Sequence, residues 1–75
     1  MRYNGHKNWN HWNVNLWINN DEHLYRLARD YCRSNTSRDN AAREFVADLA
    51  AVGTTHTPDG APYTATTVRA AMRGM

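Results

Sequence analysis

The stretch NWNHWNVNLWINN, residues 8–20, decides the fold, because it holds all three tryptophans of the chain within nine positions and separates them with asparagines. At a helical period of 100° per residue, the large apolar side chains share one broad stripe: Trp9, Trp12, Leu16 and Trp17. Polar residues follow one another at spacings of three and four on the opposite side: Asn8, His11, Asn15 and Asn19. Asparagine is also rare in strands. The stretch is therefore predicted to be a helix.

Two smaller apolar residues, Val14 and Ile18, widen the apolar arc of this helix beyond what one neighbouring element covers. We therefore expect a central helix, wrapped by others, with its tryptophans in the core. Asn10 and Asn13 then lie beside buried rings. Their amides are expected to bind backbone groups or to cap the segment, and a ligand-binding role is the alternative.

Two more amphipathic helices are predicted in residues 20–34 and 36–53. Asn20 is the expected N-cap of the first, either Thr36 or Ser37 begins the second, and Gly53 ends it. The first buries Leu24, Tyr25, Leu27, Ala28, Tyr31 and Cys32, and the second buries Ala41, Ala42, Phe45, Val46, Leu49 and Val52. Cys32 is expected to be a buried structural thiol.

The last third of the chain changes in composition, with many threonines and a Pro-Asp-Gly turn signal at residues 58–60. An extended loop or a short hairpin is predicted near residues 54–63. Thr64 then caps a last helix with two faces. Its buried face is Ala65, Val68, Ala71 and Met72, and its outer face is Thr66, Arg69, Ala70 and Arg73.

These elements predict an all-α fold, a small three- to four-helix bundle that forms a single helical domain over residues 1–75. One core is expected to unite the first three helices. Its members are Trp9, Trp12, Leu16, Trp17, Leu24, Leu27, Phe45 and Leu49.

The composition of the chain limits the cellular location and the classes of function that we expect. A single cysteine fits a reducing compartment, and no run approaches the length of a membrane helix, so a cytoplasmic protein in a bacterial host cell is expected. The net charge of +2 is unevenly spread, because residues 1–20 and residues 60–75 carry cationic side chains and no acid. The four histidines and four glycines form no metal-ligand or phosphate-loop pattern. We therefore expect no enzyme, no catalytic residue, no metal and no cofactor.

Residues 49–72, LAAVGTTHTPDGAPYTATTVRAAM, resemble the helix, loop and helix near the DNA-binding end of large serine recombinases. In that family a T-P-x-G-G-x-W loop precedes a T-x-x-T-V-R helix that reads DNA. Tyr63 occupies the position of the tryptophan that is usual in the recombinases, and Asp59 occupies a position where they commonly have a basic residue. The resemblance implies a DNA-reading last helix. Recombination is not implied, because no catalytic serine domain accompanies the motif.

Residues 3–21, YNGHKNWNHWNVNLWINND, are similar to a second group, the small phage- and plasmid-borne proteins of undefined function. That group opens with the signature Y-N-G-x-x-N-W-x-x-W-N-V-x-L-W-I-x-N-D. The resemblance implies a mobile-element setting, in which chains of this size commonly inhibit host defences or regulate nearby genes.

The first functional hypothesis is a stoichiometric, anti-CRISPR-like inhibitor that binds a host defence protein or nucleoprotein complex. Its expected contacts are Tyr3, His6, His11 and Asn15. The alternative is a small helix-turn-helix-like DNA-binding regulator, acting as a homodimer. It would place Thr66, Arg69 and Arg73 in a major groove. Nine lysines and arginines against seven acids leave few phosphate contacts, which favours the inhibitor.

Overall fold

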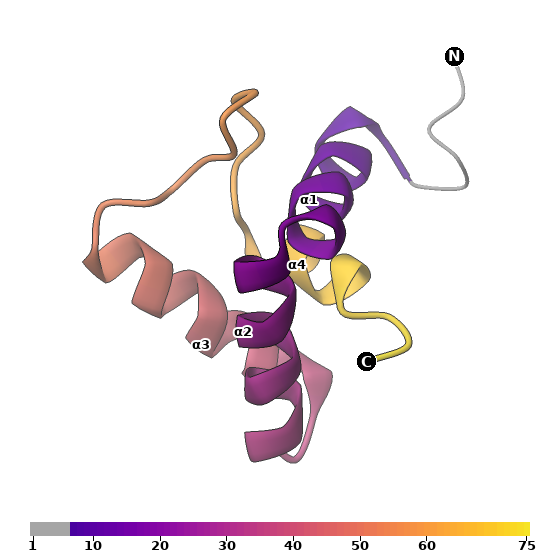
Figure 1. Ribbon diagram of the computed structural model, residues 1–75, viewed down its shortest axis with the longest axis vertical. Coiled ribbons are helices and arrows are strands. Elements are labelled where there is room, and N and C mark those ends of the chain that lie inside the picture. The colour runs from indigo at the N-terminus through magenta and orange to yellow at the C-terminus, as the bar shows by residue number, and fades with distance from the viewer. Residues whose placement is uncertain (1–6) are drawn as a thin grey trace.

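The computed structural model describes residues 7–75, which form four helices and one short hairpin (Figure 1). The helices are α1 (Trp9–Asn20), α2 (Glu22–Ser34), α3 (Arg38–Ala51) and α4 (Ala65–Ala71). They close into a ring, because α1 packs against α2 and α4, and α3 packs against the same two helices. The predicted all-α bundle is confirmed. None of the helices within residues 7–75 is long and apolar enough to cross a membrane.

Each helix begins at a side chain that accepts a hydrogen bond from a backbone N–H of the first turn. These N-caps are Asn8, Asp21, Ser37 and Thr64. Ser37 is one of the two residues predicted to cap α3, and Thr64 is the predicted cap of α4, where it forms a capping box with Thr67. The prediction that Asn20 caps the second helix is wrong by one residue. α1 continues through Asn20, so Asp21 alone links the two helices, ending α1 and capping α2.

The end of α3 is set by Gly53, as the sequence predicts. Its φ of +82° is a left-handed conformation that glycine adopts without strain. The next residue, Thr54, then donates its N–H to the carbonyl of Leu49 at 2.9 Å, the bond of a Schellman motif. Val52 lies at this turn and is 76 % exposed, so its predicted burial is wrong.

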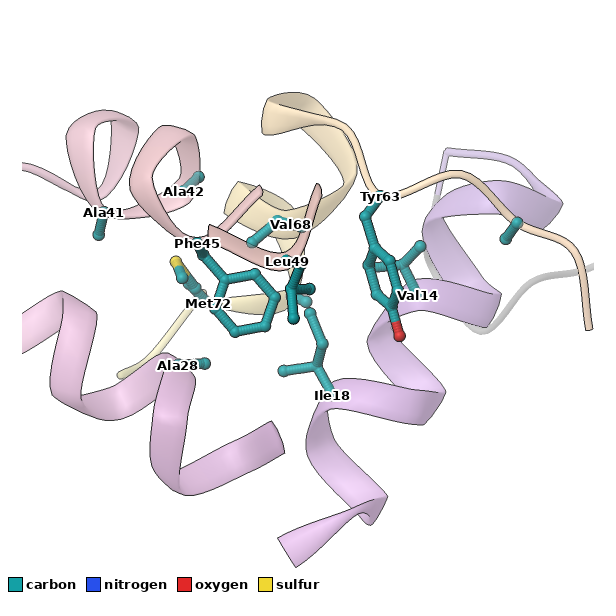
Figure 2. Packing of buried hydrophobic residues seen from close by; sticks show 12 residues of the cluster. Val14, Ile18, Ala28, Ala41, Ala42, Phe45, Leu49, Tyr63, Val68 and Met72 are labelled. Atoms are coloured by element: carbon teal, nitrogen blue, oxygen red, sulfur yellow. The ribbon is translucent and has the colours of Figure 1, made fainter. Parts of the chain in front are cut away.

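The core lies inside the ring of helices and is centred on Phe45 (Figure 2). The ring of Phe45 packs edge to face against Tyr31 at 5.7 Å and against Tyr63 at 6.4 Å between centroids. The other buried apolar residues come from all four helices and the hairpin: Val14, Ile18, Ala28, Ala41, Ala42, Leu49, Ala61, Val68, Ala71 and Met72. The predicted core positions of Phe45 and Leu49 are therefore confirmed. Leu24 and Leu27 are half-buried and pack against this cluster.

The predicted burial of the tryptophans is wrong. α1 turns Val14 and Ile18 inward, and both are fully buried, whereas Trp9 is 37 % exposed. Trp12, Leu16 and Trp17 are half-buried and lie outside the core cluster. The physical reason is size, since the distance between packed helices depends on the side chains at the contact. The smaller Val14 and Ile18 let α1 approach its neighbours more closely than indole rings would.

Residues 54–63 form a short hairpin, one of the two predicted forms, paired by a single bridge between His56 and Pro62. The N–H of Thr57 donates to the carbonyl of Ala61 at 2.8 Å, and the N–H of Gly60 donates back to the carbonyl of Thr57 at 2.9 Å. Gly60 has a φ of +99°, which this tight turn requires. The hairpin therefore ends in a turn that presents Asp59 at its tip.

Side chains of α1 hold the hairpin in place. The carboxylate of Asp59 accepts hydrogen bonds from the amide of Asn13 and from the indole N–H of Trp17, each at 2.9 Å. The bond from Asn13 has the larger effect and the bond from Trp17 the smaller one, and together they lower the pKa of Asp59. The hydroxyl of Thr57 donates to the other end of the Asn13 amide at 2.6 Å. The buried Asn13 thus binds loop side chains, and the predicted backbone or capping role is wrong.

Candidate functional site

A hollow of about 540 Å³ opens where α4 passes between the beginnings of α1 and α3. We call it the basic groove. It is lined by Lys7, His11, Asp39, Arg43, Ala65, Thr66, Arg69, Ala70 and Arg73. Residues from three separate parts of the sequence therefore meet in one concave surface.

The floor of the basic groove is the outer face of α4 and the turn after it. Thr66, Arg69 and Arg73 follow one another at spacings of three and four, which aligns them on one side of a helix. The opposite side of α4 is anchored in the core by Val68 and Ala71. Ala65, Thr66 and Ala70 have short side chains, so the longer cationic side chains extend beyond them around the hollow.

The charge of the basic groove is strongly positive. Four cationic side chains line it, Lys7, Arg43, Arg69 and Arg73, against the single carboxylate of Asp39. Asp39 forms an ion pair with the Nε atom of Arg69. Both side chains are more than half exposed, so water and salt screen this pair and it stabilises the fold little. The arrangement provides an excess of three positive charges on a concave surface.

The reactive side chains outside the groove are poor candidates for catalysis. Burial raises the pKa of the Cys32 thiol, and this outweighs the opposing effect of Arg38, so the thiol is kept protonated. The hydroxyl of Tyr31 donates to the carboxylate of Asp48, and this bond raises the pKa of Tyr31 to about 12. Within residues 7–75, no three histidine, cysteine or acidic side chains come together to form a metal site.

The structure brings together the three residues predicted to bind nucleic acid, Thr66, Arg69 and Arg73, and adds His11 from the predicted partner-binding set. Asn15 lies elsewhere on α1, where its side-chain oxygen accepts a hydrogen bond from Asn19 at 2.8 Å. Tyr3 and His6 lie outside the described residues. The two predicted surfaces therefore overlap in the basic groove through His11.

Sequence reasoning missed Lys7, Asp39 and Arg43 as members of this site. Arg43 projects from α3 between core residues and offers no signal of its own, because exposed arginines are common on helices. The available signal was the basic character of both chain ends, which the packing of α1 against α4 brings side by side.

A family model matches residues 1–75, the whole chain, and its description is a family of unknown function, DUF7249. This chain belongs to the DUF7249 family. Neither a curated protein nor a solved structure matches the chain significantly. Within this DUF7249 chain, the recombinase-like residues 49–72 form the end of α3, the hairpin and α4. Asp59, which departs from the recombinase pattern, binds α1 and does not line the basic groove.

Proposed function

We propose that this protein is a non-catalytic binding protein that holds the phosphate backbone of a nucleic acid in the basic groove. The observation that carries the proposal is the groove itself, where four cationic side chains face one hollow and the only carboxylate among its lining residues is already paired. Cationic side chains that contact phosphates release counterions, and this release supplies most of the affinity of non-specific binding.

The geometry favours contact with the backbone over reading of the bases. A recognition helix must project from its domain to enter a major groove, which is about 12 Å wide. α4 instead forms the floor of a hollow, with side chains of α1 and α3 beside it. Among residues 7–75, the lining contains no tryptophan, tyrosine or phenylalanine on which a base could stack. Binding should therefore depend on salt and little on sequence.

Fluorescence anisotropy with a labelled duplex of about 20 base pairs, titrated across a series of salt concentrations, tests this proposal. Each phosphate contact contributes about −0.9 to the slope of log K against log salt. Replacing Arg69 and Arg73 together by Ala should weaken binding and make the slope shallower by about 1.8.

The matched control for this titration replaces Arg29 and Arg33 by Ala, which removes the same charge from exposed positions on α2. Since α2 and α4 do not pack against each other, this pair should change the slope much less. An equal effect of the two pairs would show that net charge, and not the groove, determines binding. Unchanged binding of the Arg69 and Arg73 variant would exclude the groove.

A second candidate function is stoichiometric inhibition of a host defence complex, in the mobile-element setting that the N-terminal signature implies. One observation favours it: His11, a predicted partner contact, lies in the basic groove near Arg69 and Arg73. A nucleoprotein complex presents phosphates to such a groove, and an acidic protein surface presents carboxylates.

Pull-down from a bacterial lysate, with and without nuclease, separates the two functions. Loss of all partners after nuclease treatment supports the nucleic-acid proposal. A partner that resists nuclease supports inhibition, and titration of that partner should then reach complete inhibition near a fixed molar ratio. Inactivation that progresses with time at far lower ratios would contradict a binding mechanism.

A further inference from the structure

We propose that the outer face of α1 is a self-association surface, on which α1 of a second copy of this chain docks. Three large apolar residues form this tryptophan face, Trp9, Trp12 and Leu16. Their spacing of three and four residues places them along one line of the helix. The same spacing forms the seam along which one helix packs against another in coiled coils.

The fold leaves the tryptophan face without a partner helix of its own. α1 packs against α2 and α4, and it directs the buried Val14 and Ile18 toward the core. None of the three residues of the tryptophan face belongs to the core cluster or to the side chains that pack against it. Trp9 is 37 % exposed, and Trp12 and Leu16 are half-buried.

The charge of α1 indicates what covers this face. From Trp9 to Asn20 the helix contains no Asp, Glu, Lys or Arg, although one residue in five of the whole chain is charged. A strongly charged partner would lose hydration there without gaining an ion pair. A second copy of the chain brings an equally uncharged face, so contact between two such faces meets no charge repulsion.

The polar border of the face is also complementary to itself. Asn15 and Asn19 lie beside Trp12 on the helical wheel, and not on the opposite side as predicted. The amide nitrogen of Asn19 donates to the side-chain oxygen of Asn15 at 2.8 Å and to the carbonyl of Ala71 at 3.2 Å. In a two-fold symmetric contact the same patch of each copy meets, so the amide nitrogen of Asn15 can donate across it and the side-chain oxygen of Asn19 can accept. Aromatic side chains are enriched at the centres of such interfaces.

The self-associated form leaves the basic groove accessible. His11 lines the groove, and it lies about 100° around the helix from Trp12, the centre of the tryptophan face. Two copies joined through α1 would therefore present two basic grooves, one from each chain, on either side of the contact.

Sedimentation velocity from about 1 µM to about 1 mM tests the proposal, since this range spans weak and moderate dimers. The mass should rise from 8.6 kDa toward twice that value as the concentration rises. Trp12→Glu places like charges near the two-fold axis and should weaken the dimer at least about tenfold. Far-UV circular dichroism checks that the variant is folded. If it is not, Trp9→Glu at the more exposed position replaces it.

The control is Val52→Glu, which introduces the same charge at an exposed apolar residue at the end of α3. This variant should dimerise like the parent. If the parent chain stays monomeric across this concentration range, the proposal is overturned, and a different protein is then the partner of the tryptophan face. A folded tryptophan-face variant that dimerises normally also overturns it, as does equal weakening by Val52→Glu.

Discussion

Replacement of Asn13 by Ala should destabilise the fold by removing two of the hydrogen bonds that join α1 to the hairpin, those with Thr57 and Asp59. Asn13 is 1 % exposed and Thr57 is 4 % exposed, so the bond between them is shielded from water. Removing one partner of a buried hydrogen bond leaves the other unsatisfied, at a cost of about 1–3 kcal/mol. A chain of this length has a free energy of unfolding of only about 4–11 kcal/mol. The change is therefore a large share of the total.

Thermal unfolding followed by circular dichroism measures this effect. A change of about 1 kcal/mol shifts the Tm of a small domain by about 4–8 °C, so Asn13→Ala should lower the Tm by about 5–20 °C. Asn20→Ala is the matched control, because Asn20 is exposed on the same helix. Its Tm should stay close to that of the parent, since surface substitutions usually change stability by less than about 0.5 kcal/mol.

A double-mutant cycle with Thr57→Val then isolates the bond itself. Valine keeps the shape of threonine and removes its hydroxyl, so both substitutions delete the bond between Thr57 and Asn13. Asn13→Ala also deletes the bond to Asp59, and Thr57→Val also deletes the bond from the N–H of Ala61, so only the shared bond contributes to the coupling. Their effects should be non-additive by at least about 0.5 kcal/mol. The reasoning is refuted if Asn13→Ala melts with the parent, or if the two effects add without coupling.

Two other predictions concern the basic groove and Tyr31. Asp39→Asn removes the carboxylate that pairs with Arg69, so it should tighten nucleic-acid binding about two- to fivefold. Asp30→Asn on α2 is the control, because it removes the same charge outside the groove. An equal gain in affinity for both variants would show that net charge alone determines binding. The hydrogen bond to Asp48 raises the pKa of Tyr31 from 10.0 to about 12, so the folded state holds this proton more tightly than the unfolded chain does. The contribution of this bond to the free energy of unfolding is therefore complete below pH 10 and is lost as the pH rises toward 12. Denaturant unfolding measures the free energy of unfolding at about pH 9 and about pH 11.5, and this free energy should fall less in Tyr31→Phe than in the parent. An identical fall in the two proteins would contradict the raised pKa of Tyr31.

The helices could be predicted because each carries its own local signals. Thr64 and Ser37 cap their helices through side chains that reach only three residues along the chain, and Gly53 ends α3 through its own backbone conformation. Such interactions are decided within one turn, so the sequence specifies them without knowledge of the tertiary structure. The same holds for the side of α4 that carries Arg69, which the turn after the helix continues to Arg73, because helical spacing alone predicts that they align.

The orientation of α1 could not be predicted for the opposite reason. Its apolar residues surround the helix, so periodicity supports an inward face of Trp12 and Leu16 as readily as one of Val14 and Ile18. The choice is made by how closely α4 approaches, which is a property of the assembled bundle. Lys7 and Arg43 enter the candidate site through the same packing, at separations that no local pattern reports.

The pairing of the first helix with the last has a consequence for biosynthesis. α1 packs most extensively against α4, and they lie side by side although they stand near opposite ends of the chain (Figure 1). Met72, which fills the core beside Phe45, is translated long after α1. While it is still inside the ribosome, α1 has emerged with all three tryptophans and has no α4 to pack against. The nascent chain therefore completes this core only after Met72 has left the ribosome, and it depends until then on chaperones or on its own solubility.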